Sequence, residues 1–197
     1  METLVVATNN KHKLDEIRAI LYGKFEIKSL DDVGIQIDIP ETGSTFYENA
    51  LIKADTICKL TGSATMADDS GLEVVALDGQ PGVHSARYAG EPCNDQDNNS
   101  LLLKKMSSSV DRRAKFVSAI VACFPDGRII SATGETSGTI IDKPRGNGGF
   151  GYDPLFLSDE IGKTFGEASS IEKNKISHRA RALQQFIYNL EQETCQK

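Results

Sequence analysis

The chain has 197 residues, of which 39% are hydrophobic and 25% charged, and its formal net charge is −6 at pH 7. This length suits one domain with a sizeable core and is too short for two ordinary domains joined by a linker. The acidic balance argues against sequence-blind binding to nucleic acid, which depends on basic surface. Any phosphate ligand must therefore be attracted by local lysines and a bound metal.

The cysteines and the apolar runs indicate where the protein works. No C-x-x-C pair or histidine cluster accompanies the four cysteines, which argues against a zinc site and for a reducing compartment: Cys58, Cys93, Cys123 and Cys195. The N-terminus begins a strand at once, without the features of a signal peptide, and the longest apolar-rich run, Phe116 to Phe124, is too short to span a bilayer. We therefore predict a cytoplasmic protein with no membrane partner.

The first predicted element is a short apolar strand from Leu4 to Thr8, followed by a polar loop and a helical period that opens at Leu14. A helix start after a strand is a favourable place for an anion, because its first N–H groups and its dipole are positive there. Lys11 and Lys13 add charge at the same place. An ordinary capped helix with solvated lysines is the alternative.

Alternation of apolar and polar residues predicts a half-exposed strand from Ile35 to Ile39. A helix follows after a loop, and Thr45 and Glu48 give loose support for its start. Its apolar side comprises Phe46, Ala50 and Ile57. Lys53 falls on this same side, so it either lies along the edge of the core or points its ammonium group into a cleft where a phosphate could bind.

The next stretch, Met66 to Val74, places two adjacent carboxylates, Asp68 and Asp69, and the Ser70 hydroxyl between two short apolar runs. We predict a tight turn here between the end of one strand and the start of another, relaxed by Gly71. Neighbouring aspartates repel each other and need a cation, a proton or strong donors, as in a Mg²⁺ site. A solvated turn or a strand cap is the alternative.

The middle of the chain predicts a helix and a long sheet. Asp95 to Met106 has the pattern of a helix, and Ala114 to Phe124 is apolar on both faces, as in a central buried strand. Asp126-Gly127 is a hairpin signal, and Arg128 to Glu135 is the returning strand. The order favours one compact α/β unit.

A glycine-rich stretch, Arg145 to Pro154, contains G-x-G-x-x-G from Gly146 to Gly151. It does not predict a dinucleotide-binding fold, because a proline and a strand-like segment follow where that fold needs a helix. The glycines allow the backbone to approach a ligand, with Phe150 and Tyr152 offering rings for stacking. Alternatively, Phe150 fills the core under a flexible turn.

The last predicted helix follows Ser177, a plausible N-cap, which places His178 and Arg179 in the first turn. Cations there oppose the helix dipole, and such violations are expected where a site sets the residue. Lys173 and Lys175 precede the helix, either as part of that site or as a solvated basic patch.

Together these residues supply the chemistry of a nucleotide hydrolase. Carboxylates with Mg²⁺ and lysines neutralise phosphate oxygens and position or deprotonate water: Glu41, Asp68, Asp69, Lys13 and Lys53. An aromatic ring with donors near it holds a base.

The sequence closely resembles the inosine/xanthosine triphosphate pyrophosphatase family from Val5 to Leu190. The resemblance rests on ordered blocks: Thr8-x-Asn10-x-x-Lys13, Glu41-Thr42-Gly43-x-Thr45-Phe46-x-Glu48-Asn49-Ala50, Lys53-Ala54, Ala67-Asp68-Asp69-Ser70-Gly71-Leu72, Pro81-Gly82-Val83-x-Ser85-Ala86-Arg87-Tyr88, Gly148-Gly149-Phe150-Gly151-Tyr152-Asp153-Pro154 and Ser177-His178-Arg179. Asn9 stands where a glycine is common and Asn147 where a threonine is common, and neither position carries known chemistry.

The resemblance implies Mg²⁺-dependent hydrolysis between the α and β phosphates of ITP, dITP and XTP, which gives the monophosphate and pyrophosphate and removes these nucleotides from the pool. It also implies a single two-lobed domain over residues 1–197, with an elongated mixed β-sheet, flanking helices and a central substrate cleft. A homodimer with a small nucleotide substrate and no nucleic-acid partner is implied as well.

The resemblance also assigns roles to single residues. The metal would be held by Glu41 and Asp69. The catalytic group would be Asp69 as the proton acceptor, Asp68 as its support or as a second metal ligand, and Lys53. The substrate would be bound by Thr8, Asn9, Asn10, Lys11, His12, Lys13, Ser70, Phe150, Gly151, Tyr152, Asp153, Lys173, His178 and Arg179. Within this set, Thr8 to Lys13 would hold the triphosphate together with Lys53. Phe150 would stack on the base, and Lys173, His178 and Arg179 would reach its edge.

Two rival functions remain open on the sequence. The first is a nucleotide sensor that binds without turnover, although the acidic cluster is more than a binder needs. The second is a related hydrolase of modified pyrimidine or other nucleotides, or one that releases single phosphates.

Overall fold

The computed structural model describes residues 2–195, which form two compact units. The first unit is drawn from Met1–Asp69, Ser118–Gly134 and Arg179–Lys197, and the second from Ser70–Val117 and Glu135–His178. Within the described chain, no helix is long and apolar enough to cross a membrane. The prediction of a single two-lobed domain around a cleft stays a prediction.

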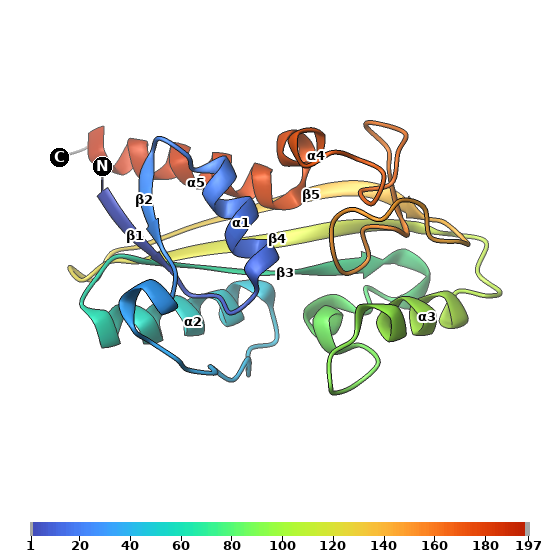
Figure 1. Ribbon diagram of the computed structural model, residues 1–197, viewed down its shortest axis with the longest axis horizontal. Helices are drawn as coiled ribbons and strands as arrows, with labels where there is room; N and C mark the ends of the chain where they lie inside the picture. The colour runs from blue at the N-terminus through green and yellow to red at the C-terminus, as the bar shows by residue number, and fades with distance from the viewer. Residues whose placement is uncertain (1, 196–197) are drawn as a thin grey trace. The chain divides into compact units, whose positions relative to one another are not determined.

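A six-stranded mixed sheet has the strand order β2-β1-β3-β4-β5-β6 (Figure 1). The strands are β1 (Glu2–Val6), β2 (Phe25–Lys28), β3 (Thr65–Val74), β4 (Arg113–Cys123), β5 (Ile129–Ile140) and β6 (Phe156–Ser158). Strand β1 pairs in parallel with β2 and β3, whereas β5 and β6 are antiparallel. The prediction of an α/β fold with a mixed sheet and flanking helices is confirmed.

Within residues 2–195, five α-helices accompany the sheet: α1 (Lys11–Ile20), α2 (Phe46–Thr61), α3 (Asp95–Lys105), α4 (Ser170–Ile176) and α5 (His178–Cys195). In the first unit, α2 lies on the opposite side of the strands from α1 and α5 (Figure 1). The alternation along β1 explains this arrangement: Leu4 and Val6 are buried with residues of α1 and α5, whereas Val5 is buried with residues of α2. Both faces of these strands are therefore covered.

The core of the second unit is aromatic. The Phe116 ring lies with its centroid 4.6 Å from that of Phe156 and 6.0 Å from that of Phe165. All three side chains are buried, together with Tyr152 and Leu102 of α3. Tyr152 belongs both to this aromatic core and to the glycine-rich loop, so the core packing holds the loop in place.

The predicted turn at Asp68 and Asp69 is wrong, because both residues lie inside the continuous strand β3. Gly71 is also part of this strand and is absent from the residues with positive φ. The strand continues because basic side chains neutralise the two buried carboxylates, as described below, so no exposed turn is needed to solvate them.

The predicted strand from Ile35 to Ile39 is also wrong: these residues form no strand. The alternation is nevertheless real, since Ile35, Ile37 and Ile39 pack against the core under α2 while the polar residues between them are exposed. Burial of one face thus produced a strand-like pattern without a partner strand. The short strand β2 was not predicted.

Other predicted elements are confirmed. The hairpin at Asp126-Gly127 joins β4 to β5, with Phe124 N–H donating to Arg128 O at 3.0 Å and Gly127 at φ 88°. No helix follows the glycine-rich loop, and α5 begins at His178. Three cysteines are free thiols, Cys58, Cys93 and Cys123, and the side chain of Cys195 lies outside the described residues.

Candidate active site

A lysine and two carboxylates form the centre of the first unit. Lys53 Nζ lies 2.7 Å from Glu41 Oε1 and 3.0 Å from Asp69 Oδ1, and it also donates to the carbonyl oxygen of Asp68 at 3.2 Å. Asp69 is 5% exposed. The Lys53 ammonium group therefore points at the carboxylates and does not merely lie along the edge of the core.

Helix α2 places Lys53 accurately because its start is fixed. Thr45 Oγ1 accepts from Glu48 N–H at 3.1 Å, and the Glu48 carboxylate accepts from Thr45 N–H at 3.2 Å, which is a complete capping box. From the sequence alone, the support for a helix start at Thr45 and Glu48 was only loose, whereas the structure shows the complete capping box. Lys53 follows two turns later on the side of α2 that faces β3.

Burial and charge set the protonation of this cluster. Burial disfavours the charged form of Lys53, but Asp69 and Glu41 outweigh it and raise the pKa of the lysine. Burial raises the pKa of Asp69 above its usual value, with Glu41 adding to the effect, and Lys53 and Lys13 oppose it only in part. Asp69 thus combines a raised proton affinity with a fixed position, which suits a proton acceptor.

Asp68 belongs to a separate buried network. Its Oδ2 lies 3.0 Å from Arg179 Nη2 and 2.9 Å from Lys13 Nζ, and its Oδ1 accepts from Ser118 Oγ at 2.5 Å. Burial would raise the pKa of Asp68, but Arg179 and Lys13 outweigh burial and hold that pKa well below its usual value. Arg179 also pairs with Glu16 of α1. Asp68 is therefore a permanent anion that anchors cations, which suits the supporting role predicted for it.

The N-terminus of α1 lies beside this network. Asn10 caps the helix, with its Oδ1 accepting from Lys13 N–H at 3.1 Å, and Thr8 Oγ1 accepts from Asn10 N–H at 3.1 Å. Asn9 Nδ2 donates to Ile37 O at 3.1 Å. Lys11 and His12 are exposed in the first turn. A capped helix start with basic side chains can hold an anion through its N–H groups and charge.

The second unit holds the predicted base-binding residues. Lys173 Nζ lies 2.5 Å from Asp153 Oδ2 and 4.8 Å from the centre of the Phe150 ring, and Asp153 Oδ2 also accepts from Phe150 N–H at 2.9 Å. Gly149 has φ 71°, and a Cβ there would come within 2.0 Å of Asp153 Oδ2. The loop therefore brings Phe150, Asp153 and Lys173 together only because residue 149 is glycine.

Of the remaining predicted residues of the second unit, Gly151 and Tyr152 belong to this loop, whereas Ser70 lies in β3 and His178 in α5. Tyr152 is buried and its hydroxyl donates to Ser85 O at 2.8 Å, and burial raises its pKa. Gly151 N–H donates to Asp95 Oδ2 at 2.7 Å. The His178 ring stacks on Phe116 with centroids 4.8 Å apart. Ser70 follows Asp69 in β3 and is partly buried.

Glu41 and Asp69 fit the requirements of Mg²⁺. Their carboxylate oxygens converge on one positive charge, the Lys53 ammonium group, at 2.7 and 3.0 Å. Mg²⁺ is bound through one or two carboxylates, with waters and substrate phosphates completing its octahedron. No group of three or more histidine, cysteine, aspartate or glutamate residues is arranged to hold a metal in the described chain.

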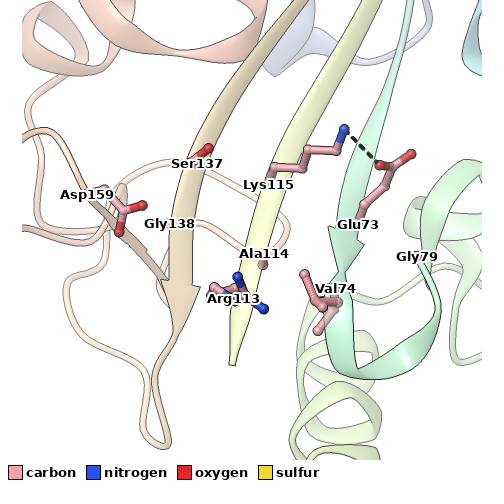
Figure 2. A pocket seen from close by; sticks show the side chains of 10 residues that line it. Glu73, Val74, Gly79, Arg113, Ala114, Lys115, Ser137, Gly138 and Asp159 are labelled. Carbon is pink, nitrogen blue, oxygen red and sulfur yellow. Dashed lines mark ion pairs between the residues drawn. The ribbon is translucent and has the colours of Figure 1, made fainter. Parts of the chain in front are cut away.

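A hollow of about 450 Å³ lies elsewhere in the second unit, on the strands β3, β4 and β5 (Figure 2). Lys115 of β4 extends over it toward Glu73 of β3, with Nζ and Oε2 3.4 Å apart. Its lining residues comprise Glu73, Val74, Val75, Gly79, Arg113, Ala114, Lys115, Ser137, Gly138 and Asp159. None of these ten is a predicted site residue.

Three residues of the first unit join the site without having been predicted for it. Asn49 contacts Asp69, Ser118 contacts Asp68, and Glu16 contacts Arg179. A signal existed for Asn49, since it lies four residues before Lys53, on the same helical side as apolar neighbours. Ser118 and Glu16 gave no such signal, because their partners are 50 and 163 residues away in the chain.

Known proteins resemble the chain over nearly its whole length. Residues 4–189 match the Ham1 family. The dITP/XTP pyrophosphatase of Bacillus licheniformis is 48% identical, with 98% of this chain and 100% of that protein covered. That of Geobacter sulfurreducens is 50% identical, with coverage of 93% and 94%. The solved structure of the Staphylococcus aureus Ham1 protein is 40% identical and has a TM-score of 0.88, with 98% of this chain and 100% of that chain covered.

The matches confirm the predicted class, a hydrolase that releases pyrophosphate from nucleoside triphosphates. The chain belongs to the Ham1 family. The predicted family resemblance is thereby confirmed.

Proposed function

We propose that the protein hydrolyses the bond between the α and β phosphates of deaminated purine nucleoside triphosphates, namely ITP, dITP and XTP. The products are the monophosphate and pyrophosphate, and the reaction removes these nucleotides from the pool. The observation that carries the proposal is the convergence of Glu41 and Asp69 on the Lys53 ammonium group. The names of the relatives, dITP/XTP pyrophosphatase, support the choice of substrate.

Glu41 and Asp69 would hold Mg²⁺, which neutralises phosphate oxygens and acts as a Lewis acid when bound. Lys53 is a permanent cation between the two carboxylates and stabilises charge on the phosphates. Asp69, whose pKa burial raises, accepts the proton of the attacking water. Asp68 keeps Lys13 and Arg179 in place.

The triphosphate binds at the start of α1. The capped helix terminus offers N–H groups and a positive dipole, and Lys11 and Lys13 add charge. Lys13 is held by Asp68 at 2.9 Å, so its ammonium group has a fixed position before the substrate arrives. Such fixed donors lower the cost of reorganisation on binding.

Residues of the second unit hold the base. Phe150 stacks on it, and Lys173 stands over the same ring, where a cation and a π-system attract each other. Hypoxanthine and xanthine carry a 6-oxo acceptor where adenine carries an amino donor. Donors in the pocket therefore pair with the deaminated bases and are left unpaired by adenine, which can discriminate by about 10⁴-fold.

The family resemblance supports two further proposals, a homodimer and a cytoplasmic location. Light scattering on the purified protein tests the first, with a mass of about twice 21.4 kDa expected for the dimer. Fractionation of the native cells tests the second, and recovery in the membrane or the medium would contradict it.

The activity is tested by incubating the protein with ITP, ATP, GTP or a modified pyrimidine triphosphate, with Mg²⁺ or with EDTA, and separating pyrophosphate from orthophosphate. IMP and pyrophosphate formed from ITP only with Mg²⁺ are expected. Orthophosphate would move the reaction to the γ phosphate, and tight ITP binding without turnover would favour a nucleotide sensor. Equal turnover of modified pyrimidine triphosphates would favour the related hydrolase.

A further inference from the structure

The side-chain amide of Asn49 in α2 is fully buried, and both its nitrogen and its oxygen form hydrogen bonds. Its Nδ2 donates to Asp69 Oδ2 at 3.2 Å, and its Oδ1 accepts from Gly43 N–H at 2.8 Å. Its exposed fraction is 0%. Loss of either hydrogen bond would leave a buried polar atom without a partner, which is energetically costly. The two partners therefore fix the orientation of the amide.

The backbone at Gly43 lies so close to α2 that only glycine fits at this position. A Cβ at this position would lie 2.8 Å from Asn49 Oδ1 and 2.6 Å from Glu48 Cβ. Gly43 is two residues after Glu41 in the same loop. The amide that contacts Asp69 therefore also anchors the loop that carries Glu41, the other predicted metal ligand.

The polarity of this arrangement is fixed. The Gly43 N–H needs an acceptor, so the amide oxygen faces the loop and the NH₂ group faces Asp69. Lys53 Nζ holds the other oxygen of Asp69, Oδ1, at 3.0 Å. The Asp69 carboxylate is thus held at both oxygens by residues one helical turn apart on α2.

We propose that Asn49 is a positioning residue, which fixes the orientation of the Asp69 carboxylate relative to the loop of Glu41. This inference rests on the proposed function, in which those two carboxylates serve Mg²⁺ and the attacking water. Residues that orient metal ligands are worth about 10-fold to 100-fold in metal affinity or activity. The effect is on the geometry of the carboxylates, so turnover should fall more than substrate binding.

Asn98 of α3 provides a matched control. It is also a buried amide on a helix, and it clamps a loop in the same way: Nδ2 donates to Ala86 O at 3.0 Å and Oδ1 accepts from Ala89 N–H at 2.7 Å. Neither partner is a carboxylate. Asn98→Ala, like Asn49→Ala, removes one hydrogen bond that the side-chain amide donates and one that it accepts, and it deletes the same side-chain atoms.

The test compares Asn49→Ala with Asn98→Ala and the wild type. The readouts are kcat and KM for ITP with saturating Mg²⁺, Tm, and Mn²⁺ binding followed by electron paramagnetic resonance with the non-cleavable α,β-methylene analogue of ITP. We expect Asn49→Ala to lower kcat about 10-fold to 100-fold, with KM within about threefold of the wild type, and to weaken Mn²⁺ binding. Asn98→Ala should lower Tm similarly and leave kcat and Mn²⁺ binding within about twofold of the wild-type values.

Equal kcat in the two variants would overturn the role of Asn49. If Asn49→Ala does not fold, Asn49→Asp decides the question, because it keeps the shape and the acceptor for Gly43 but replaces the donor to Asp69 by a carboxylate oxygen that repels it. A wild-type kcat in Asn49→Asp would likewise overturn the inference. Failure of the proposed function is distinguishable, since the wild type itself would then release no pyrophosphate from ITP.

Discussion

Arg179 and Asp68 form an ion pair between side chains that are both 0% exposed, with Nη2 3.0 Å from Oδ2. The pair ties the first turn of α5 to the middle of β3, and Lys13 of α1 reaches the same carboxylate oxygen. The cations at the start of α5, which oppose the helix dipole, are therefore accounted for in part by Asp68. A role of Arg179 at the edge of the base stays a prediction.

Replacing Asp68 by asparagine takes from the buried Arg179 guanidinium group one of its two carboxylate partners, with Glu16 remaining, and takes from Lys13 the carboxylate that it pairs with. We expect Asp68→Asn to lower the free energy of unfolding by about 3–5 kcal/mol, the cost of breaking a buried pair. Urea denaturation at pH 7 measures this. The control is Asp32→Asn, which breaks the exposed pair with Arg18, whose atoms are 3.0 Å apart, and should cost about 0–1 kcal/mol. Equal losses in the two variants would contradict the prediction.

The same pair predicts how stability depends on pH. The folded pKa of Asp68 is lowered, so its stabilising contribution is present above the unfolded pKa of about 3.9 and is lost as the pH falls through the folded pKa. The difference in unfolding free energy between wild type and Asp68→Asn should be constant from about pH 5 to 8 and shrink below about pH 4. Denaturation series in EDTA across this range measure it. A difference that grew toward acid pH would contradict the assignment.

Sequence patterns predicted α1, α2, α3, α5 and the long central strands, because amphipathic periodicity and a hairpin turn are local signals, whereas the short helix α4 was not predicted. They failed at β3, where two adjacent aspartates indicated a turn. The sequence around the two aspartates does not show that cations neutralise them inside a sheet. Lys53 pairs with Asp69, and Arg179, which is 111 residues away in the chain, pairs with Asp68. They failed again at Ile35 to Ile39, where the alternation was correct and the partner strand was missing.

For the candidate site, the sequence indicated the residue types but not how their side chains pair. Residue types in ordered blocks identified the acids and lysines, and the structure brings Glu41, Lys53 and Asp69 together in one unit. The pairing of each carboxylate with its own cation could not be predicted, since it depends on how α2 and α5 pack against β3. Asn49 was missed although its place on the same helical side as Lys53 was a signal.

Lys53 is expected to be needed for turnover, because it is the cation between the two carboxylates. Lys53→Met should lower kcat by about 10²-fold to 10³-fold, the usual cost of removing a donor that stabilises transition-state charge. The control is Lys59→Met on the same helix, where Lys59 is exposed and pairs with Asp55 at 2.6 Å. Steady-state kinetics with ITP and Mg²⁺ measure both variants. A loss in Lys59→Met as large as that in Lys53→Met would point to a general effect on α2.

Asp69→Asn should keep the fold and remove the proton acceptor. The side chains have the same size, and Lys53 can still donate to the amide oxygen. We expect kcat to fall by about 10²-fold to 10⁴-fold, as for the loss of a general base, while Tm stays close to that of the wild type. Activity near the wild-type level would remove Asp69 from the mechanism, and loss of the folded state would show a structural role instead.

Lys173 should affect substrate binding more than turnover, because it contacts Asp153 and Phe150 of the loop that is proposed to bind the base. Lys173→Met leaves the buried Asp153 carboxylate without its cation, which stands 2.5 Å away, and removes the charge over the Phe150 ring. We expect KM for ITP to rise about tenfold, equivalent to about 1.4 kcal/mol of binding free energy, with kcat changed by less than about threefold. Lys175→Met on the same helix is the control, since Lys175 is exposed. A fall in kcat at unchanged KM would place Lys173 in the chemical step and contradict its assignment to the base.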